Sequence, residues 1–322
     1  MLLKLEFKYF SFRLNSTLNT SKGIISQKKG WLVYAEDIVG NIGWGEIAPI
    51  DQNELKYCED FIQNKKGNTH IEIIESEIDL LPPSVAFGIG SALSELKGEI
   101  GVGSKNNWLK PYDSAILLSS RDEILIEINK WNQKKRKYNH KLTFKIKVAI
   151  ESIKEERNLL MKIFKEMPEN AKLRIDANGG WSRIEANAMA DYLRNEPKLE
   201  WIEQPLPPND IEGLLKLKNK IPVALDESLL DLPSLRSTWP SWQIRRPLIE
   251  GDPRSIMKDM NKNSSFIVIS TAFETGIGSR WVKHLAALQQ KSPTPTAPGL
   301  APGWCPNSEL FSTDPFLVWE AA

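Results

Sequence analysis

Histidine and cysteine are scarce in this sequence, whose 322 residues include three histidines and two cysteines. The cysteines, Cys58 and Cys305, lie far apart and belong to no CxxC motif or Cys/His cluster, so a disulfide scaffold is not indicated. Two unpaired thiols are typical of a reducing compartment, and we expect a cytoplasmic protein. His70, His140 and His284 lie outside the predicted strand ends, which disfavours zinc chemistry and histidine-dependent triads.

The sequence also lacks an excess of charge of either sign and any long apolar run. Its 42 Lys and Arg residues balance 41 Asp and Glu residues, so no surface for nucleic acid or an anionic membrane is indicated. No apolar run reaches the roughly 18 residues of a membrane span. The opening MLLKLEFKYFSFRL alternates apolar and polar residues as a strand does, unlike a signal peptide. We therefore expect a small-molecule partner, no nucleic acid, no membrane, and a monomer or small homo-oligomer.

A dinucleotide-binding fingerprint is missing as well. No GxGxxG motif follows a predicted strand, opens a helix and precedes an acidic residue at the required distance. The glycines of AFGIGSAL follow two prolines and lack the third glycine of that motif, and they predict a tight packing contact instead.

The spacing of apolar residues changes along the chain. Residues 1 to about 50 alternate with period two around a turn near Val39, Gly40 and Asn41, which predicts a small antiparallel sheet. Helical spacing follows, from Glu54 to about Gly101. We predict an α+β capping domain at 1–105, completed by a C-terminal segment at about 305–322.

Short apolar runs then alternate with longer amphipathic stretches over residues 106–304, the predicted catalytic domain. Predicted helices lie at 153–167 and 183–196. The predicted strands are 114–120, 143–150, 172–178, 199–205, 222–228, 241–247, 265–271 and a short one near Thr296. This βα rhythm predicts a parallel (β/α) barrel, although a doubly wound open sheet has a similar rhythm.

Three acidic residues each fall at the C-terminal end of a different predicted strand. Asp176, Glu203 and Asp226 are spaced by one βα unit, and such strand ends converge on one face of a barrel. Clustered carboxylates repel one another unless a cation lies between them. Because an all-oxygen site suits Mg²⁺ or Mn²⁺, the three residues predict a divalent-metal site.

The strand before this series carries two lysines in KIK. Lys145 and Lys147 face the same side of the strand because they are two residues apart. If Ile146 and Val148 face the helices, both lysines face the barrel mouth. A lysine in such a charged site can have its pKa lowered enough to act as a general base.

These motifs together resemble the muconate-lactonizing subgroup of the enolase superfamily, and within it the cyanobacterial and plant-like o-succinylbenzoate synthase family. KIK, RIDAN, IEQP and ALDES resemble the subgroup's barrel motifs in order, and GWGEIAP resembles its capping-domain signature. The resemblance implies a modified TIM barrel with an α+β capping domain. It also implies a Mg²⁺-dependent dehydratase that acts on a small-molecule carboxylate through a metal-stabilised enediolate.

The resemblance assigns roles residue by residue. Asp176, Glu203 and Asp226 would bind Mg²⁺, with Mn²⁺ a substitute. Lys147 would remove the α proton and then protonate the departing hydroxyl. Lys145 would add positive charge beside the enediolate, and Asn178 would orient neighbouring polar groups.

Arg246 departs from the family pattern, which has lysine before the proline of the sixth strand. Because arginine keeps its proton, it cannot be a second base. This disfavours racemases but permits a one-base dehydration, in which Arg246 supplies positive charge or forms an ion pair at the barrel mouth.

The glycine-rich segments 270–278 and 293–304 resemble substrate-binding loops. They predict contacts from Thr275, Gly276 and Gly299 to the succinyl carboxylate, and a lid near Leu18 to Gly23. Alternative functions are a muconate cycloisomerase, an N-succinylamino acid racemase, or a non-catalytic metal- or ligand-binding relative.

Overall fold

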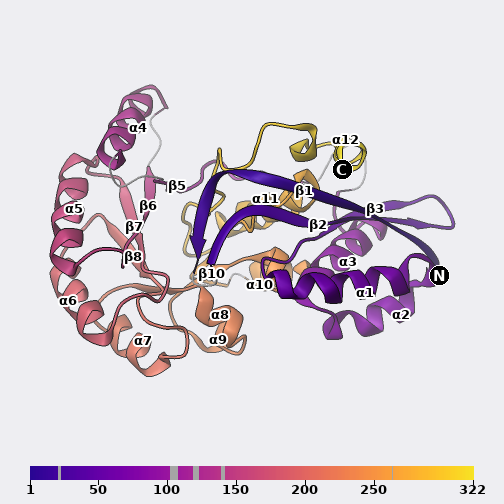
Figure 1. Cartoon of the computed structure of the whole chain (residues 1–322), viewed down its shortest axis with the longest axis horizontal. Helices are drawn as coiled ribbons and strands as arrows, with labels where there is room; N and C mark the ends of the chain where they lie inside the picture. Colours follow the sequence, from indigo (N-terminus) through magenta and orange to yellow (C-terminus); the bar gives the residue numbers. More distant parts are fainter. Residues whose placement is uncertain (21–22, 102–107, 119–122, 139–141, 263) are drawn as a thin grey trace. The chain divides into compact units, whose positions relative to one another are not determined.

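The described residues form two compact units, drawn in Figure 1. The computed structural model describes residues 1–20, 23–101, 108–118, 123–138, 142–262 and 264–322. Unit 1 comprises Met1–Tyr112, Arg245–Ser265 and Ile269–Ala322, and unit 2 comprises Asp113–Ile244 and Phe266–Val268. The predicted boundary between residues 105 and 106 lies outside the described residues, so the predicted domain division stays a prediction.

An antiparallel sheet forms one side of unit 1, as the alternating N-terminal pattern predicted. Its order is β3-β2-β1-β4. The strands are β1 (Leu2–Thr20), β2 (Gly23–Asp37), β3 (Ile42–Ile47) and β4 (Gly67–His70). The predicted turn follows β2, where Asp37 Oδ1 accepts hydrogen bonds from the N–H groups of Val39 and Asn41, each at 2.9 Å. Residues 21–22 of the predicted lid lie outside the described residues.

Helices pack on this sheet around an apolar core. The helices of unit 1 are α1 (Leu55–Lys65), α2 (Ile71–Glu77), α3 (Pro83–Leu96), α10 (Pro253–Asn261), α11 (Gly276–Gln289) and α12 (Pro315–Ala321). Gly45 lets α3 approach β3, because a Cβ there would lie 1.9 Å from the carbonyl oxygen of Gly88. Gly88 belongs to AFGIGSAL, so the predicted packing role of those glycines is confirmed.

The C-terminal helix α12 also belongs to unit 1. The Trp44 ring on β3 lies 5.1 Å from that of Phe316 and 5.7 Å from that of Trp319, with edge-to-face geometry. Lys8 Nζ on β1 donates a 2.7 Å hydrogen bond to the Trp319 carbonyl. These contacts attach the end of the chain to the N-terminal sheet.

Unit 2 contains most of a curled parallel sheet with the order β11-β10-β9-β8-β7-β6-β5. The strands are β5 (Ile116–Leu117), β6 (Thr143–Lys147), β7 (Lys172–Asp176), β8 (Leu199–Glu203), β9 (Val223–Leu225), β10 (Trp242–Arg245) and β11 (Ile267–Ile269). Together with the antiparallel sheet this is an enolase-like fold, so the predicted fold class is confirmed. The segment near Thr296 differs from the prediction: it forms no strand, and a parallel bridge joins Ser270 to Gly299.

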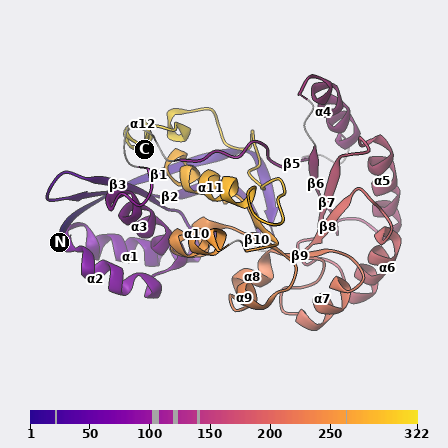
Figure 2. The ribbon, with the colours of Figure 1, turned by 180° about the vertical axis from the view of Figure 1, so that it is seen from behind.

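Helices cover the outer face of this sheet, as Figures 1 and 2 show for α5, α6 and α7 beside β6, β7 and β8. The helices of unit 2 are α4 (Ile124–Tyr138), α5 (Ile153–Glu166), α6 (Arg183–Leu193), α7 (Ile211–Lys218), α8 (Glu227–Asp231) and α9 (Leu235–Thr238). Ile146 and Val148 belong to the core on this face, together with Leu160 of α5. The predicted orientation of the β6 strand is thus confirmed.

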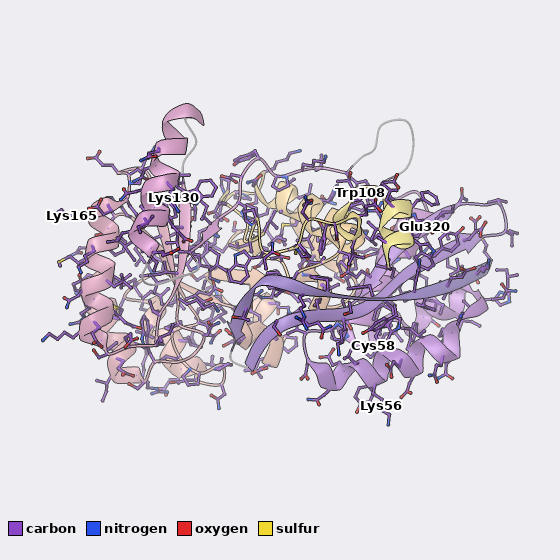
Figure 3. The ribbon with its side chains drawn as sticks, turned by 45° about the horizontal axis from the view of Figure 1, so that its top comes forward. Lys56, Cys58, Trp108, Lys130, Lys165 and Glu320 are labelled. Carbon is purple, nitrogen blue, oxygen red and sulfur yellow. The ribbon has the colours of Figure 1, made fainter. Side chains whose placement is uncertain are left out.

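The two cysteines and the apolar character of the helices bear on the sequence expectations about disulfides and membrane spans. Cys58 is buried on α1, two residues after the exposed Lys56, and both are labelled in Figure 3. Cys58 and Cys305 are both free thiols. Among the described residues, no helix combines the length and apolarity needed to cross a membrane.

Candidate active site

The predicted catalytic residues of β6, β7 and β8 lie side by side at the C-terminal ends of these strands. Lys147 is the register partner of Asp176, and Asp176 is the partner of Glu203. Glu203 pairs with Ala224 of β9. Asp226 follows Ala224 by two residues and therefore emerges on the same side. The parallel register thus brings one lysine and three carboxylates to one edge of unit 2.

Lys145 connects two of these carboxylates directly. Its Nζ donates a 2.6 Å hydrogen bond to Glu203 Oε1 and lies 2.9 Å from Asp176 Oδ2. Lys147 Nζ lies 3.4 Å from the same Asp176 oxygen. Both carboxylates are almost completely buried, with 1% of each side chain exposed. Ion pairs in so dry a setting are strong only while both partners remain in place.

Burial and charge move the carboxylate pKa values apart. Burial raises the pKa of Glu203 to about 7; Lys145 opposes this rise, and the charges of Asp176 and Asp226 add to it. Burial alone would also raise the pKa of Asp176, but the ammonium groups of Lys145 and Lys147 outweigh it and lower that pKa. Opposed shifts among clustered acidic groups are common at functional sites.

The donor set fits a hard divalent cation in chemistry and in sequence position. Asp176 Oδ2 is buried and has no hydrogen-bond donor of ordinary geometry in the described part of the chain. In the present arrangement Lys145 holds the carboxylates, and no group of three or more His, Cys, Asp or Glu side chains among the described residues is placed as a metal site.

Asn178 lies between the lysine and the next strand. Its Oδ1 accepts a short hydrogen bond from Lys147 Nζ, and its Nδ2 donates a 2.9 Å hydrogen bond to Glu227 Oε1. Its backbone N–H donates to Asp176 Oδ1 at 3.0 Å. The predicted orienting role of Asn178 therefore has a structural basis, and Glu227 joins the site as a residue that the sequence analysis missed.

Gln204 is a second missed residue. It is completely buried. Its Oε1 accepts hydrogen bonds from the N–H groups of Asp226, at 3.2 Å, and Ser228, at 3.1 Å. Its Nε2 donates to Ser228 Oγ at 2.8 Å. Gln204 and Glu227 each follow a predicted metal ligand within IEQP and ALDES, and polar residues at buried strand ends were the available signal.

Strained backbone accompanies these strand ends. Ala149, Asn178 and Gln204 have positive φ angles of 61°, 44° and 38°, and they follow β6, β7 and β8 respectively. Non-glycine residues in this region cost free energy and cluster at functional sites. These left-handed conformations turn the chain sharply just after Lys147, Asp176 and Glu203.

A stacked layer of large side chains lies toward the N-terminal ends of the same strands. The Arg174 guanidinium carbon lies 4.1 Å from the centre of the Trp201 ring, and that ring lies 4.7 Å from the Trp242 ring. Arg174 Nε donates a 2.7 Å hydrogen bond to Glu200. Arg174 and Trp201 each precede a site carboxylate by two residues, so this layer packs on the same face and supports the site from below.

Arg246 belongs to unit 1. Its Nη1 donates a 2.8 Å hydrogen bond to the Thr271 carbonyl, and its backbone N–H donates to Glu250 Oε1 at 2.5 Å. Glu250 also forms a buried ion pair with the neighbouring Arg245, at 2.6 Å. The predicted electrostatic role of Arg246 stays a prediction.

The predicted substrate contacts Thr275 and Gly276 have internal partners. Thr275 is the N-cap of α11 and is completely buried. Glu46 of GWGEIAP accepts hydrogen bonds from Thr275 N at 2.9 Å, Thr275 Oγ1 at 2.5 Å and Gly278 N at 3.1 Å. At Gly276, a Cβ would lie 1.9 Å from the Ser312 carbonyl oxygen. The anion at this helix N-terminus is therefore a carboxylate of the chain itself, and the substrate contacts stay predictions.

Gly299 also uses its backbone groups internally. Its N–H donates to the Ile269 carbonyl at 2.8 Å, and its carbonyl accepts from Thr271 N at 2.9 Å. The sequence analysis expected a backbone N–H available for a substrate carboxylate. At Gly299 that N–H extends the pairing of β11, and the substrate contact of Gly299 stays a prediction.

The fold and the position of the site define the class of protein. Residues 133–238 match the family model described as enolase C-terminal domain-like. This range contains both lysines, the three carboxylates and Asn178. These residues match the enolase C-terminal domain family, and the chain as a whole has an enolase-like fold.

Relatives named o-succinylbenzoate synthase are similar to most of the chain. The chain matches the crystal structure of o-succinylbenzoate synthase from Thermosynechococcus elongatus BP-1, complexed with Mg in the active site, with a TM-score of 0.82 and 27% identity, covering 99% of this chain and 100% of that one. It is 29% identical over 296 residues to o-succinylbenzoate synthase of Thermosynechococcus vestitus, covering 88% of each chain. It is 26% identical to that of Aliivibrio fischeri strain MJ11, covering 86% and 83%.

More distant structures share the fold. The L-Ala-D/L-Glu epimerase from Bacillus subtilis aligns with a TM-score of 0.73 at 17% identity, covering 94% of this chain and 90% of that one. Because one fold supports several reactions, this likeness carries no information about the substrate.

Proposed function

We propose that the chain is an o-succinylbenzoate synthase. It would remove water from 2-succinyl-6-hydroxy-2,4-cyclohexadiene-1-carboxylate to give 2-succinylbenzoate, a step towards menaquinone or phylloquinone. The observation that carries the proposal is the placement of Lys147 beside Asp176 and Glu203 at adjacent strand ends. The similarity to named o-succinylbenzoate synthases over most of the chain supports this choice of reaction.

In this proposal Lys147 is the group that moves the proton. As a free amine it would take the proton from the carbon next to the substrate carboxylate, so that the C–H electron pair enters the ring. The C–O bond to the ring hydroxyl would then break, and the Lys147 ammonium would return the proton to the departing oxygen as water. Atoms and electrons balance without an oxidant, and the ring becomes aromatic.

The carboxylates of Asp176, Glu203 and Asp226 would hold Mg²⁺, which supplies positive charge to the substrate carboxylate. Mn²⁺ has similar ligand preferences. Lys145 adds a second positive charge, already 2.6 Å from Glu203. Preorganised cations stabilise charge that develops during proton removal because they need no reorganisation at that moment.

The related reactions of the same subgroup require different numbers of catalytic bases. A racemase needs a base on each face of the substrate carbon, and arginine at position 246 cannot lose its proton. A muconate cycloisomerase needs one base, as the proposed dehydration does. The substrate therefore has to be decided by assay.

The test is a spectrophotometric assay of purified protein with Mg²⁺ and the cyclohexadiene carboxylate. We expect rapid loss of the diene absorbance, abolished by EDTA and restored by added Mg²⁺. Parallel assays use cis,cis-muconate and N-succinylamino acids. Turnover of either of these substrates but not of the cyclohexadiene would replace the proposed reaction with the corresponding sister reaction.

A further inference from the structure

The Asn178 amide is hydrogen-bonded on both sides within unit 2. Lys147 Nζ donates to Oδ1, and Nδ2 donates to Glu227 Oε1 at 2.9 Å. The three residues belong to β6, the turn after β7 and the start of α8. A chain of two hydrogen bonds therefore runs across three neighbouring βα segments and ends on the lysine that we assign as the base.

The chemistry of its two neighbours fixes the direction of this amide. An ammonium group has donors and no acceptor, so Lys147 requires the amide oxygen. The amide nitrogen must then face Glu227, whose Oε1 accepts. If Glu227 offered no acceptor, the NH₂ group would lose its buried partner, and a flip of the amide would point NH₂ at the ammonium. The carboxylate thus specifies the orientation in which Asn178 can hold Lys147.

Glu227 is placed firmly enough to act in this way. Its carboxylate is enclosed, since Oε2 has almost no exposed surface and no hydrogen-bond partner in the described part of the chain. It is the first residue of α8, and Gln204 fixes the turn on both sides of it by accepting from the N–H groups of Asp226 and Ser228. A hydrogen bond to so enclosed an acceptor is costly to leave unmade.

We propose that Glu227 is a positioning residue for Lys147, which it holds in place through the side-chain amide of Asn178. The proposal rests on the proposed function, in which Lys147 is the base. Asp176 Oδ2, at 3.4 Å, also faces Lys147, but Asp176 is an assigned metal ligand. Asn178 gives Lys147 an acceptor that a metal ion does not claim. In this role Glu227 acts on Lys147 through its hydrogen bond with Asn178.

Two substitutions of similar size separate this role from simple packing. Glu227→Gln keeps an acceptor oxygen for Asn178, whereas Glu227→Met fills the space without one. Glu212→Met is the control, because Glu212 is exposed on α7 of the same unit and is paired with Lys216 at 2.5 Å. Its ion-pair partners are Lys216 and Arg183.

The first readout requires no catalysis. In protein labelled with ¹⁵N-lysine, the Lys147 Nζ signal is assigned by its loss in Lys147→Met. We expect this signal to shift in Asn178→Ala and in Glu227→Met, and to stay in place in Glu227→Gln and Glu212→Met. A shift in Asn178→Ala without one in Glu227→Met would overturn the proposal.

The second readout is kinetic. Because misplacing a catalytic group by about 1 Å can cost roughly 100-fold in rate, we expect Glu227→Met to lower kcat by about 10- to 100-fold. The KM and the Mg²⁺ dissociation constant should stay near the wild-type values, and Glu227→Gln should restore most of kcat. Loss of Mg²⁺ affinity with normal kcat at saturating Mg²⁺ would overturn the proposal. A wild-type protein with no dehydratase activity would instead refute the proposed function, while the Nζ signals still report on the hydrogen-bond chain.

Discussion

Two buried carboxylates, Glu46 in unit 1 and Asp176 in unit 2, are satisfied in opposite ways. Glu46 accepts from two backbone N–H groups and one hydroxyl, all within 3.2 Å. Asp176 accepts from the Asn178 N–H at Oδ1, while Oδ2 lies beside the ammonium groups of Lys145 and Lys147. The backbone N–H groups around Glu46 are fixed in place, whereas the flexible side chains of Lys145 and Lys147 can move away from Asp176. The first arrangement holds a helix end, and the second can exchange its cation for another.

This difference indicates whether a buried acidic residue of this chain stabilises the fold or is suited to bind a cation. Glu46 anchors the N-terminus of α11, where N–H groups and the helix dipole favour negative charge. Asp176 and Glu203 instead lie beside the Lys145 ammonium. A site for a divalent ion is expected where carboxylates lack fixed donors.

The largest effect should come from removing the base in unit 2. Lys147→Met is expected to lower kcat by about 10²- to 10⁴-fold, the usual contribution of a positioned acid or base. The dehydration assay measures this, with thermal unfolding as the check on folding. Lys216→Met serves as the control, because Lys216 is exposed on α7 and pairs with Glu212. A Lys147→Met protein with near-normal kcat would remove Lys147 from the mechanism.

An intermediate effect is expected at Gln204, which orients a proposed ligand without touching the ion. Gln204→Ala removes the acceptor for the N–H groups of Asp226 and Ser228. Residues that orient metal ligands typically contribute about 10- to 100-fold in affinity, so the Mg²⁺ dissociation constant should rise by that amount. Isothermal titration calorimetry measures it. Unchanged affinity in a folded variant would show that Asp226 needs no such support.

The smallest effect concerns stability and Glu46. Burial raises its pKa from 4.5 to about 7, although the Thr275 hydrogen bond opposes the rise. Between these pH values the folded state keeps a proton that the unfolded state has lost. The free energy of unfolding should therefore be highest below about pH 4.5 and fall as pH rises to about 7, by at most about 1.4 kcal/mol per pH unit from this group.

Glu46→Gln cannot titrate, so the difference between wild type and variant isolates this contribution. Urea unfolding at pH 5 and pH 7 should show a smaller decline in the variant than in the wild type. Equal declines would mean that the three donors to Glu46 outweigh its burial.

The sequence predicted the centre of the site better than its surroundings. Lys147, Asp176 and Glu203 were predictable because strand alternation and βα spacing are local patterns that a parallel register converts into proximity. Glu227 and Gln204 act through turns after the strands, where φ is positive at Gln204 and side-chain direction no longer follows a period of two. Their polar character at buried strand ends was a signal, but no local pattern indicated which groups they contact.

Long-range packing limited the predictions for the glycine-rich loops. Thr275 and Gly276 looked available for an anion, but Glu46, from a distant part of the chain, occupies the N-terminus of α11. Gly299 pairs with Ile269 for a similar reason. The curled parallel sheet was predictable from its rhythm, whereas the segment near Thr296 is too short for its pattern to distinguish a strand from a single bridge.

Calorimetric titration of metal-free protein with Mg²⁺ tests the central claim most directly, using wild type, Asp176→Asn and Glu46→Gln. The account predicts one Mg²⁺ site per chain in the wild type and in Glu46→Gln, and no measurable binding in Asp176→Asn. Equal binding by Asp176→Asn and wild type, or loss of binding in a folded Glu46→Gln protein, would contradict the assignment of the metal site to unit 2.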